Sequence, residues 1–317
     1  MSAKHHDFGS TMPDLNSFFS PKSIAVIGAS ERDTSMGGLV LQNLKSSSFE
    51  YPVVAVNLKG YQSVFGFPCV KYLRETQQPI DLGIICVPPE VIPRILRQMG
   101  RLGIKAGLIL TGGLARQLNF SPENNRKIAK IAKEQGVRLM GPNCLGILVP
   151  EHHMNASYTH IDALPGSAAY VGHSAALGGA LLDWAGARGI GFSHFLTLGA
   201  SADIRISDVV DYLASDRRVK AILIHLEQIR DANRLLTALR AASRSKRSLP
   251  SGLILKMRHR MAFPTSEKLI TSFLLEPVCF RLILSMGSSM VSKYYRDHGL
   301  CILGIWPLSV MDWVQPC

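Results

Sequence analysis

The chain has 317 residues, of which 47% are hydrophobic and 18% charged, and its formal net charge is +12 at pH 7. This length predicts about two domains, each large enough to bury its own core. No apolar run reaches the ~18–20 residues that a membrane helix needs, and the first twenty residues lack the apolar core of a signal peptide. We therefore expect a cytoplasmic protein.

The charge distribution and the cysteine spacing argue against a nucleic-acid-binding protein and against a disulfide framework or metal site. The positive charge is spread along the chain, apart from a cluster at Arg240, Arg244, Lys246 and Arg247. No aromatic residues interleave with that cluster, so nucleic-acid binding is only a minor alternative. Six cysteines without C-x-x-C spacing favour neither a disulfide framework nor a metal site, and Cys86, in an apolar strand, is expected to be a reduced, buried thiol.

The first half of the chain alternates strand-like and helix-like segments. Strands are predicted at residues 24–28, 53–57, 82–87, 106–110 and 137–140, and amphipathic helices at residues 90–102 and 122–135. This alternation is typical of a doubly wound α/β domain, in which ligands bind at the carboxyl ends of the strands. Those ends are Gly28, Asn57 and residues 87–89, 111–113 and 141–143.

The strand end at Gly28 gives the strongest indication of a ligand site. The sequence SIAVIGAS at residues 23–30 predicts a buried strand, a small-residue loop and then a helix, an order that aims N–H groups at a bound phosphate. The dinucleotide fingerprint is absent, because Ser30 and Asp33 stand where glycines are needed. The second strand ends in Asn57 and Lys59 rather than in an acid that would hold a ribose, so NAD-linked redox chemistry is disfavoured.

A second α/β series follows a polar, proline-flanked connector. Strands are predicted at residues 167–171, 194–198, 221–226 and 252–256, and helices at residues 175–186, 206–213 and 232–243, with a turn at His173 and Ser174. The expected division is a flexible N-terminus (1–16), a first domain (17–150), a linker (151–166), a second domain (167–256) and an atypical tail (257–317). In that tail, residues 281–286 and 300–306 have strand-like composition, but no turn chemistry organises them.

Five motifs in one order resemble a known superfamily. They are SPKSIAVIGAS at 20–30, PVVAVNLKGYQSVFGFPC at 52–69, DLGIICVPPEVIP at 81–93, LMGPNCLGIL at 139–148 and HSAALGGALLDWA at 173–185. They resemble the NDP-forming acyl-CoA synthetases, relatives of succinyl-CoA synthetase. Residues 226–246 look most similar to the synthetase-like half of bacterial protein-lysine acetyltransferases, which carry a fused GCN5-type domain. The resemblance covers residues ~17–246 and implies a Rossmann-like CoA-binding domain followed by a flavodoxin-like succinyl-CoA-synthetase domain.

For the first domain, the resemblance implies CoA or acetyl-CoA as the cofactor, with no metal. Gly28, Ala29 and Ser30 would meet its phosphates through backbone N–H groups and the Ser30 hydroxyl, and Asn57 and Lys59 would face the phosphorylated ribose. Val87 and Pro88 would line the adenine or pantetheine path, and Asn143 would lie near the thiol. The structural alternatives are a solvated Lys59, a strand terminated at Pro88 and a turn formed by Asn143.

For the second domain, the resemblance implies a phosphoryl or carboxylate group at the helix N-terminus after Ser174. Family members commonly have Gln-Ser-Gly here, so His173 is a departure; it is either a phosphoryl acceptor or a packed turn residue. Glu227 matches the family's acid that orients a phosphorylated histidine, the alternative being an exposed acid at a turn. The family's relay histidine is absent, since neither His259 nor His298 lies in a small-residue loop.

We therefore expect a CoA thioester-binding module that is not catalytically complete alone and whose sequence is truncated or frameshifted after about Lys246. The main rival is an α-type subunit of an acyl-CoA synthetase that acts with a separate ATP-grasp β subunit. An inert remnant and, more distantly, a redox enzyme are further alternatives. Self-association and acyl preference are left open, and no membrane partner is expected.

Overall fold

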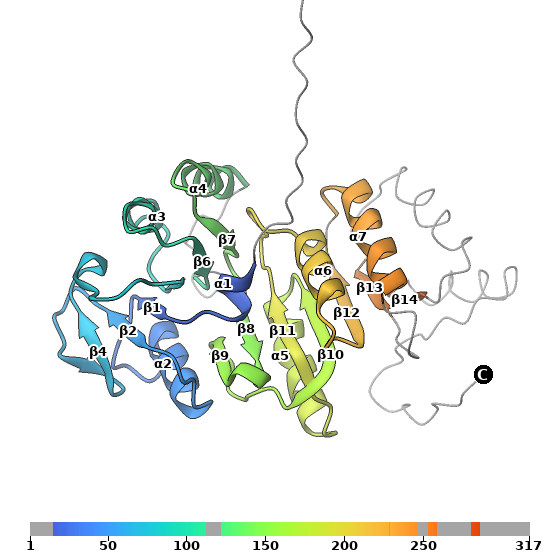
Figure 1. Ribbon diagram of the computed structural model, residues 1–317, viewed down its shortest axis with the longest axis horizontal. Helices are drawn as coiled ribbons and strands as arrows, with labels where there is room; N and C mark the ends of the chain where they lie inside the picture. Colours follow the sequence, from blue (N-terminus) through green and yellow to red (C-terminus); the bar gives the residue numbers. More distant parts are fainter. Residues whose placement is uncertain (1–14, 112–121, 228, 246–252, 259–279, 286–317) are drawn as a thin grey trace, which may run out of the picture.

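The computed structural model describes residues 15–111, 122–227, 229–245, 253–258 and 280–285. Residues 1–14 of the expected flexible N-terminus (1–16), the loop 112–121, the strand-like segment 300–306, His259 and His298 lie outside the described residues. Leu15 is buried and Asn16 begins a helix, so these two residues are ordered, contrary to expectation. Within them, two seven-stranded sheets lie next to each other (Figure 1). No helix in this part of the chain is long and apolar enough to cross a membrane.

The first sheet has the strand order β3-β4-β2-β1-β5-β6-β7 and is parallel except for the β3–β4 pair. Its strands are β1 (Ile24–Ile27), β2 (Val53–Val56), β3 (Ser63–Val64), β4 (Phe67–Val70), β5 (Leu82–Ile85), β6 (Ala106–Ile109) and β7 (Arg138–Met140). Its helical segments are α2 (Met36–Ser46), η1 (Leu73–Glu75), α3 (Ile92–Arg101) and α4 (Pro122–Glu134). The five predicted strands of this domain form in their expected order.

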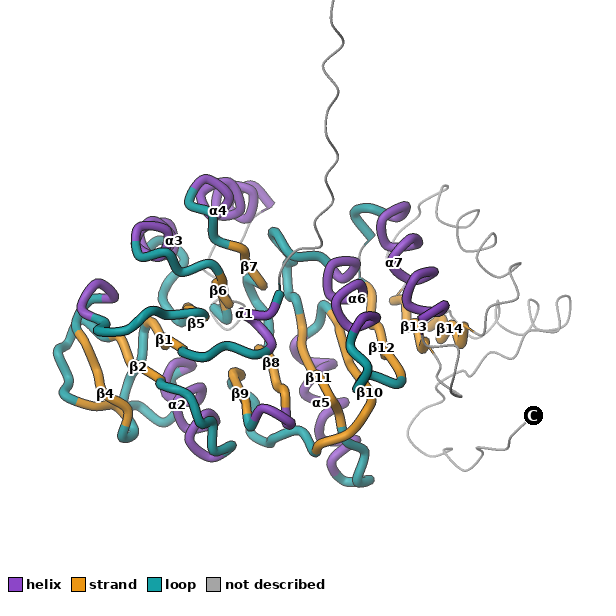
Figure 2. Tube along the Cα trace, viewed as in Figure 1, coloured by secondary structure: helices purple, strands orange, loops and turns teal. Residues whose placement is uncertain are grey.

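Alternating side chains of the buried strands explain why helices cover both faces. Ile24 and Val26 of β1 pack in one core with α2, whereas Ala25 and Ile27 pack in another with α3 and α4. A strand buried on both faces reads as a continuous apolar run, which is the pattern of β1. Figures 1 and 2 show α3 and α4 next to each other, across the strands from α2.

The second sheet has the order β14-β13-β12-β10-β11-β8-β9, with β8 and β9 antiparallel at one edge. Its strands are β8 (Gly146–Val149), β9 (Met154–Ser157), β10 (Pro165–Gly172), β11 (Phe192–Thr197), β12 (Ala221–Leu226), β13 (Leu253–Arg258) and β14 (Phe280–Ser285). Its helical segments are η2 (Pro150–His152), α5 (Ala175–Gly186), α6 (Ile206–Ser215) and α7 (Ala232–Ser245). The parallel part, β11-β10-β12-β13-β14, follows the flavodoxin order 2-1-3-4-5. The expected α/β class is thus confirmed for both domains.

In two segments of this half, the structure adds to what the sequence predicts. The segment expected as a linker, residues 151–166, contains η2, β9 and the start of β10, because β8 and β9 form a hairpin that pairs with β11. The tail contributes β14, which pairs in parallel with β13 from Leu253–Phe280 to Arg258–Ser285. This strand coincides with the segment 281–286, whose composition is strand-like.

The two domains meet along sheet edges. Asn43 of α2 donates from Nδ2 to the carbonyls of Ser157 and Thr159, at 2.9 and 2.8 Å, and so satisfies acceptors at the β9 edge. On the other side, residues 200–204 bond to the edge of β7, where Asp203 accepts from the Leu139 N–H at 2.9 Å and from Arg138 Nε at 2.8 Å. Both contacts close strand edges that would otherwise expose unpaired backbone groups.

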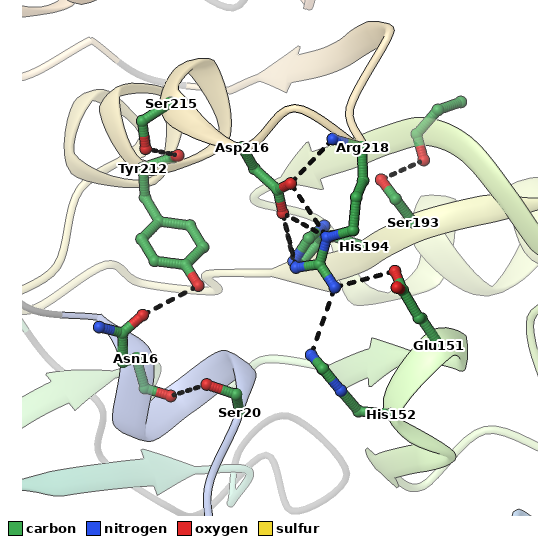
Figure 3. A network of polar contacts seen from close by, with 11 residues as sticks. Asn16, Ser20, Glu151, His152, Ser193, His194, Tyr212, Ser215, Asp216 and Arg218 are labelled. Atoms are coloured by element: carbon green, nitrogen blue, oxygen red, sulfur yellow. Dashed lines mark hydrogen bonds and ion pairs between the residues drawn. The ribbon is translucent and has the colours of Figure 1, made fainter.

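Helix α1 (Asn16–Phe19) lies at this junction. Phe19 stacks on Tyr212 of α6, with ring centroids 4.7 Å apart, and meets the His194 ring edge-on at 5.3 Å. Figure 3 shows this region, where Tyr212 donates to Asn16 and Arg218 binds Asp216, Glu151 and His152. The buried core is consequently continuous from the α2 face of the first sheet to the α6–α7 face of the second.

Candidate functional site

The first candidate site lies where the winding of the first sheet reverses. Strand β1 pairs with β2 on one side and β5 on the other, so the crevice between their carboxyl ends is the expected ligand site of such a sheet. Gly28 at the end of β1 has φ +92°, and a methyl group there would lie 2.7 Å from the Cys86 carbonyl and 2.9 Å from Val87 Cγ1. Only glycine fits this conformation in this space.

The backbone of this loop differs from expectation. The N–H groups of Gly28 and Ala29 both donate to the Val56 carbonyl, at 3.0 and 3.3 Å, so neither is free for a phosphate. The Ala29 side chain is fully buried. Ser30 is half-buried, and its Oγ accepts from the Arg32 N–H at 3.3 Å, which leaves its hydroxyl hydrogen free to donate. Of the three residues expected to meet a phosphate, Gly28 and Ala29 therefore have no free N–H group, and Ser30 keeps a free hydroxyl hydrogen.

The start of α2 supplies further free N–H groups. The sequence predicted a helix N-terminus after this loop, but it did not identify the residues that form it. Ser35 is the N-cap and accepts from the Gly38 N–H at 3.1 Å, so the N–H groups of Met36 and Gly37 have no intrahelical acceptor. A methyl group on Gly37 would lie 2.5 Å from the Gly28 carbonyl, and one on Gly38 would lie 2.7 Å from those of Ser30 and Arg32. The signal was the pair of adjacent glycines, displaced from the fingerprint positions.

Asn57 shapes the loop. Its Nδ2 donates to the Ala29 carbonyl, and its Oδ1 accepts from the Lys59 N–H at 2.8 Å. Through these two bonds, Asn57 connects the end of β2 to the loop after β1, and its second N–H remains available. Lys59 is exposed at the rim beside the exposed Leu58. The ammonium group of Lys59 therefore remains open to an anionic ligand.

The other rim residues are linked through Thr111. Its Oγ1 donates to the Val87 carbonyl at 2.8 Å, and its carbonyl accepts from the Asn143 N–H at 3.1 Å. Asn143 is exposed with φ +63°, the turn geometry of the alternative interpretation, while Pro88 is exposed after β5. Gly28, Ala29, Asn57 and Val87 thus come together, whereas Lys59, Pro88 and Asn143 are exposed after the ends of their strands.

The cysteines near this crevice are free thiols. Cys86 lies just after β5 rather than within the strand, and its thiol is buried, as the sequence predicts, although the residue as a whole is partly exposed. Burial raises the pKa of the Cys86 thiol, and it raises that of the fully buried Cys144 to about 12. Both thiols are therefore protonated at neutral pH. Among the described residues, no three His, Cys, Asp or Glu side chains cluster as metal ligands.

The second candidate site is the reversal point of the second sheet, between β10 and β12. His173 follows β10 and Glu227 follows β12, and the Glu227 N–H donates to His173 Nδ1 at 3.2 Å. Burial, with smaller contributions from His225 and Arg230, lowers the pKa of His173 to about 4. The imidazole is therefore neutral at pH 7, with its proton on Nε2.

This tautomer does not suit the phosphoryl-accepting role considered for His173. The Nδ1 lone pair is occupied by the Glu227 N–H, and Nε2 carries a hydrogen, so neither nitrogen is a free nucleophile. The Glu227 carboxylate is exposed, and its residue meets His173 through the backbone rather than through the acid. Ser174 is the N-cap of α5 and accepts from the Leu177 N–H at 3.2 Å, which agrees with the predicted turn and helix start.

Family models match the two halves in this order. Residues 22–150 match a CoA binding domain, and residues 165–249 match a succinyl-CoA ligase like flavodoxin domain. An ADP-forming acetate–CoA ligase of Methanocaldococcus jannaschii is 35% identical over 71% of this chain. The chain belongs to the NDP-forming acyl-CoA synthetase superfamily.

Further relatives and solved structures are similar to this chain over most of its length. The alpha subunit of the ADP-forming acetate–CoA ligase I of Pyrococcus furiosus is 31% identical over 73% of this chain. A Pyrococcus horikoshii protein of known structure covers 84% of this chain and 58% of its own, with a TM-score of 0.74 and 29% identity. An acetyl-coenzyme A synthetase of Ca. Korarchaeum cryptofilum, in complex with phosphate and ADP, covers 93% of this chain and 60% of its own, with a TM-score of 0.72 and 26% identity. This synthetase-like chain spans 31% of the Methanocaldococcus relative and 51% of the Pyrococcus furiosus subunit.

Proposed function

We propose that this chain is the α-type portion of an NDP-forming acyl-CoA ligase, which binds CoA or an acyl-CoA in its first domain and acts with an ATP-grasp partner. The observation that carries the proposal is the close approach of the N-terminus of α2 to the loop after β1, where Gly37 packs against the Gly28 carbonyl and the Ser30 hydroxyl hydrogen is free to donate. This arrangement suits the pyrophosphate of CoA, because a helix N-terminus presents unpaired N–H groups to an anion.

The remaining residues would divide the ligand between them. Lys59 would pair with the phosphorylated ribose, Val87 and Pro88 would line the path of the adenine or pantetheine, and Asn143 would lie near the thiol. Gly28, Ala29 and Asn57 would act by shaping the loop. Ser174 would present the N-terminus of α5 to a phosphoryl or carboxylate group, beside Glu227.

The need for a partner rests on the relatives. Two Pyrococcus furiosus ligases that this chain matches are named as alpha subunits, which supports a second subunit for the nucleotide chemistry. These relatives are ligases, and we therefore favour a ligase over an acetyltransferase fusion. The reaction would convert acyl-CoA, phosphate and NDP to acid, CoA and NTP, in the cytoplasm.

The test is a calorimetric titration of the full chain with CoA, acetyl-CoA and NAD. We expect micromolar binding of CoA and none of NAD. Ser30→Glu places a carboxylate beside the phosphates and should weaken CoA binding by about 100-fold or more, since like charges in contact cost several kcal/mol.

The matched control is Ser46→Glu, which adds the same charge to the exposed C-terminal end of α2. It should leave CoA affinity within about twofold, because exposed charges more than a Debye length apart are screened. A folded chain that binds no CoA, or equal losses in both variants, would contradict the proposal.

A further inference from the structure

The outward sides of α3 and α4 form a strongly basic surface that the proposed function does not use. The two helices lie next to each other on one side of the first sheet (Figure 1). Their C-terminal ends meet, since a methyl group on Gly100 would lie 2.7 Å from Gln135 Cβ. We call basic face the surface formed by six exposed cations, Arg94, Arg97, Arg101, Lys105, Arg126 and Lys133.

The spacing of the arginines in α3 places them on one side of that helix. Arg94, Arg97 and Arg101 follow each other at intervals of three and four residues, which forms a single stripe on a helix. The opposite side of α3 is apolar and buried against the sheet, through Ile92, Ile95, Leu96 and Met99. The three guanidinium groups therefore point away from the core.

The cations of α4 extend this stripe across the second helix. Arg126 and Lys133 are seven residues apart, or about two turns, and lie away from the buried residues of α4. The Lys105 Nζ lies 3.8 Å from the place that a methyl group on Gly136 would take, just after α4. Lys105 thus connects the ends of the two helices, and the basic face is continuous.

Acidic side chains leave this charge uncompensated. Glu123 pairs with Lys127 at 2.8 Å and Glu134 with Lys130 at 4.0 Å, so both acids of α4 are matched by lysines outside the basic face. The other acid in residues 90–111 and 122–138 is Glu90, which precedes α3. Among the described residues, no cation of the basic face has an acidic partner.

Helix stability explains only part of this arrangement. Arg101 and Lys133 lie in the last turns of their helices, where a cation complements the helix dipole. Arg94 lies in the first turn of α3, where the dipole disfavours a cation. Arg97 is one turn from both Arg94 and Arg101, so like charges repel along the stripe. A bound polyanion would remove this repulsion.

We propose that the basic face binds the phosphate backbone of a nucleic-acid duplex without reading its sequence. Four of its six cations are arginines, whose planar guanidinium groups bind phosphate in a bidentate manner. The thirteen residues of α4 span about 20 Å, the length of about six phosphates on one strand. The sequence argues against nucleic-acid binding because its charge is spread along the chain, but the fold gathers these cations on one face.

Other polyanions fit this face less well. A single strand binds through bases stacked on aromatic side chains, and residues 90–111 and 122–138 contain no Phe, Tyr or Trp. A membrane surface binds a helix whose apolar side is free to enter the lipid, whereas that side of α3 is already buried. A duplex needs only surface cations, because its phosphates lie on the outside.

The test is fluorescence anisotropy of the full chain with a labelled duplex of about 20 base pairs, prepared as DNA and as RNA. At about 50 mM salt we expect micromolar binding that weakens steeply as salt is added, with a log–log slope of about 5 for six phosphate contacts. The tighter of the two duplexes identifies the source of the backbone. The double variant Arg97→Gln/Lys133→Gln should reduce the slope by about two and weaken binding about 100-fold, because each contact contributes about tenfold at this salt concentration.

The matched control is Arg217→Gln/Lys220→Gln, which removes the same charge from exposed positions between α6 and β12. It should leave both slope and affinity unchanged, and thermal unfolding shows that both double variants are folded. Absence of duplex binding at 50 mM salt, equal losses in the two variants, or tighter binding to a single strand or to phosphatidylserine vesicles would overturn the proposal. The basic face lies outside the candidate CoA site, so a CoA titration of the same samples tests the proposed function separately.

Discussion

At the scale of single residues, Gly37 determines how closely α2 approaches the loop after β1. We predict that Gly37→Ala destabilises the fold by about 1–3 kcal/mol, since its methyl group would lie 2.5 Å from the Gly28 carbonyl and backbone must shift. CoA affinity should fall as well, because the donors of α2 move away from Ser30. Gly179→Ala in α5 has open space around it and should instead stabilise by about 0.5–1 kcal/mol. Urea unfolding and CoA titration measure both effects; equal stability changes for the two variants would refute the steric argument.

His194 makes stability depend on pH. Its ring is fully buried beside Phe19, with Nε2 3.9 Å from Asp216, and burial lowers its pKa to about 4 despite this nearby carboxylate. Because the folded pKa lies below the ordinary 6.5, the unfolded chain takes up the proton first. Stability is therefore complete above pH 6.5 and declines as the pH falls to about 4, by about 3 kcal/mol for this residue at 1.36 kcal/mol per pKa unit.

We predict that His194→Leu reduces the pH dependence of the unfolding free energy between pH 6.5 and 4 by about one proton. His173, with its similarly lowered pKa, should account for a comparable part of the remaining slope. Urea unfolding at several pH values gives both slopes. An unchanged slope in His194→Leu would show that this ring is not buried in its neutral form.

At the scale of elements, α2 contributes to both the candidate CoA site and the edge of the second sheet. Asn43→Ala removes the two hydrogen bonds to the carbonyls of Ser157 and Thr159 at the edge of the second sheet. We predict a destabilisation of about 2–3 kcal/mol. The adjacent Gln42 is a matched control, because its Nε2 is buried without a hydrogen-bond partner. Gln42→Leu should be neutral or stabilising, since it removes an unsatisfied polar group. Thermal unfolding distinguishes the two; a loss of similar size in both would contradict the role given to Asn43.

Elements with a clear period were predictable, and contacts between elements were not. The buried strands β1, β5 and β6 follow from apolar runs, and the helices α3 and α4 follow from amphipathic spacing. The strand β9 was missed because its sequence, MNAS, is polar and short; it is held by pairing with β8 and by Asn43. For the same reason, the sequence identified Gly28 and Asn57 as residues at strand ends but did not predict the hydrogen bonds that they form. Only the fold shows that Val56 uses the loop N–H groups and that Asn57 bridges two strand ends.

At the scale of the whole molecule, the two sheets share one buried core across α1 and α2. We therefore predict a single cooperative unfolding transition for both domains, with equal calorimetric and van't Hoff enthalpies. CoA should shift that whole transition upward, because a ligand stabilises the entire unit to which its site belongs. Differential scanning calorimetry with and without CoA provides the measurement. Two separate transitions, of which CoA moves only one, would show that the domains unfold independently.

Asn57 has a consequence for engineering. The conformation of residues 28–30 is imposed partly from another strand, since the Asn57 amide holds the Ala29 carbonyl and the Val56 carbonyl takes the two loop N–H groups. A graft of residues 28–38 into a different α/β scaffold would lack these partners. A transplant that also carries the end of β2 should preserve the loop, whereas the contiguous segment alone should relax into another shape. The functional unit for recombination is thus a pair of neighbouring strand ends, not a linear motif.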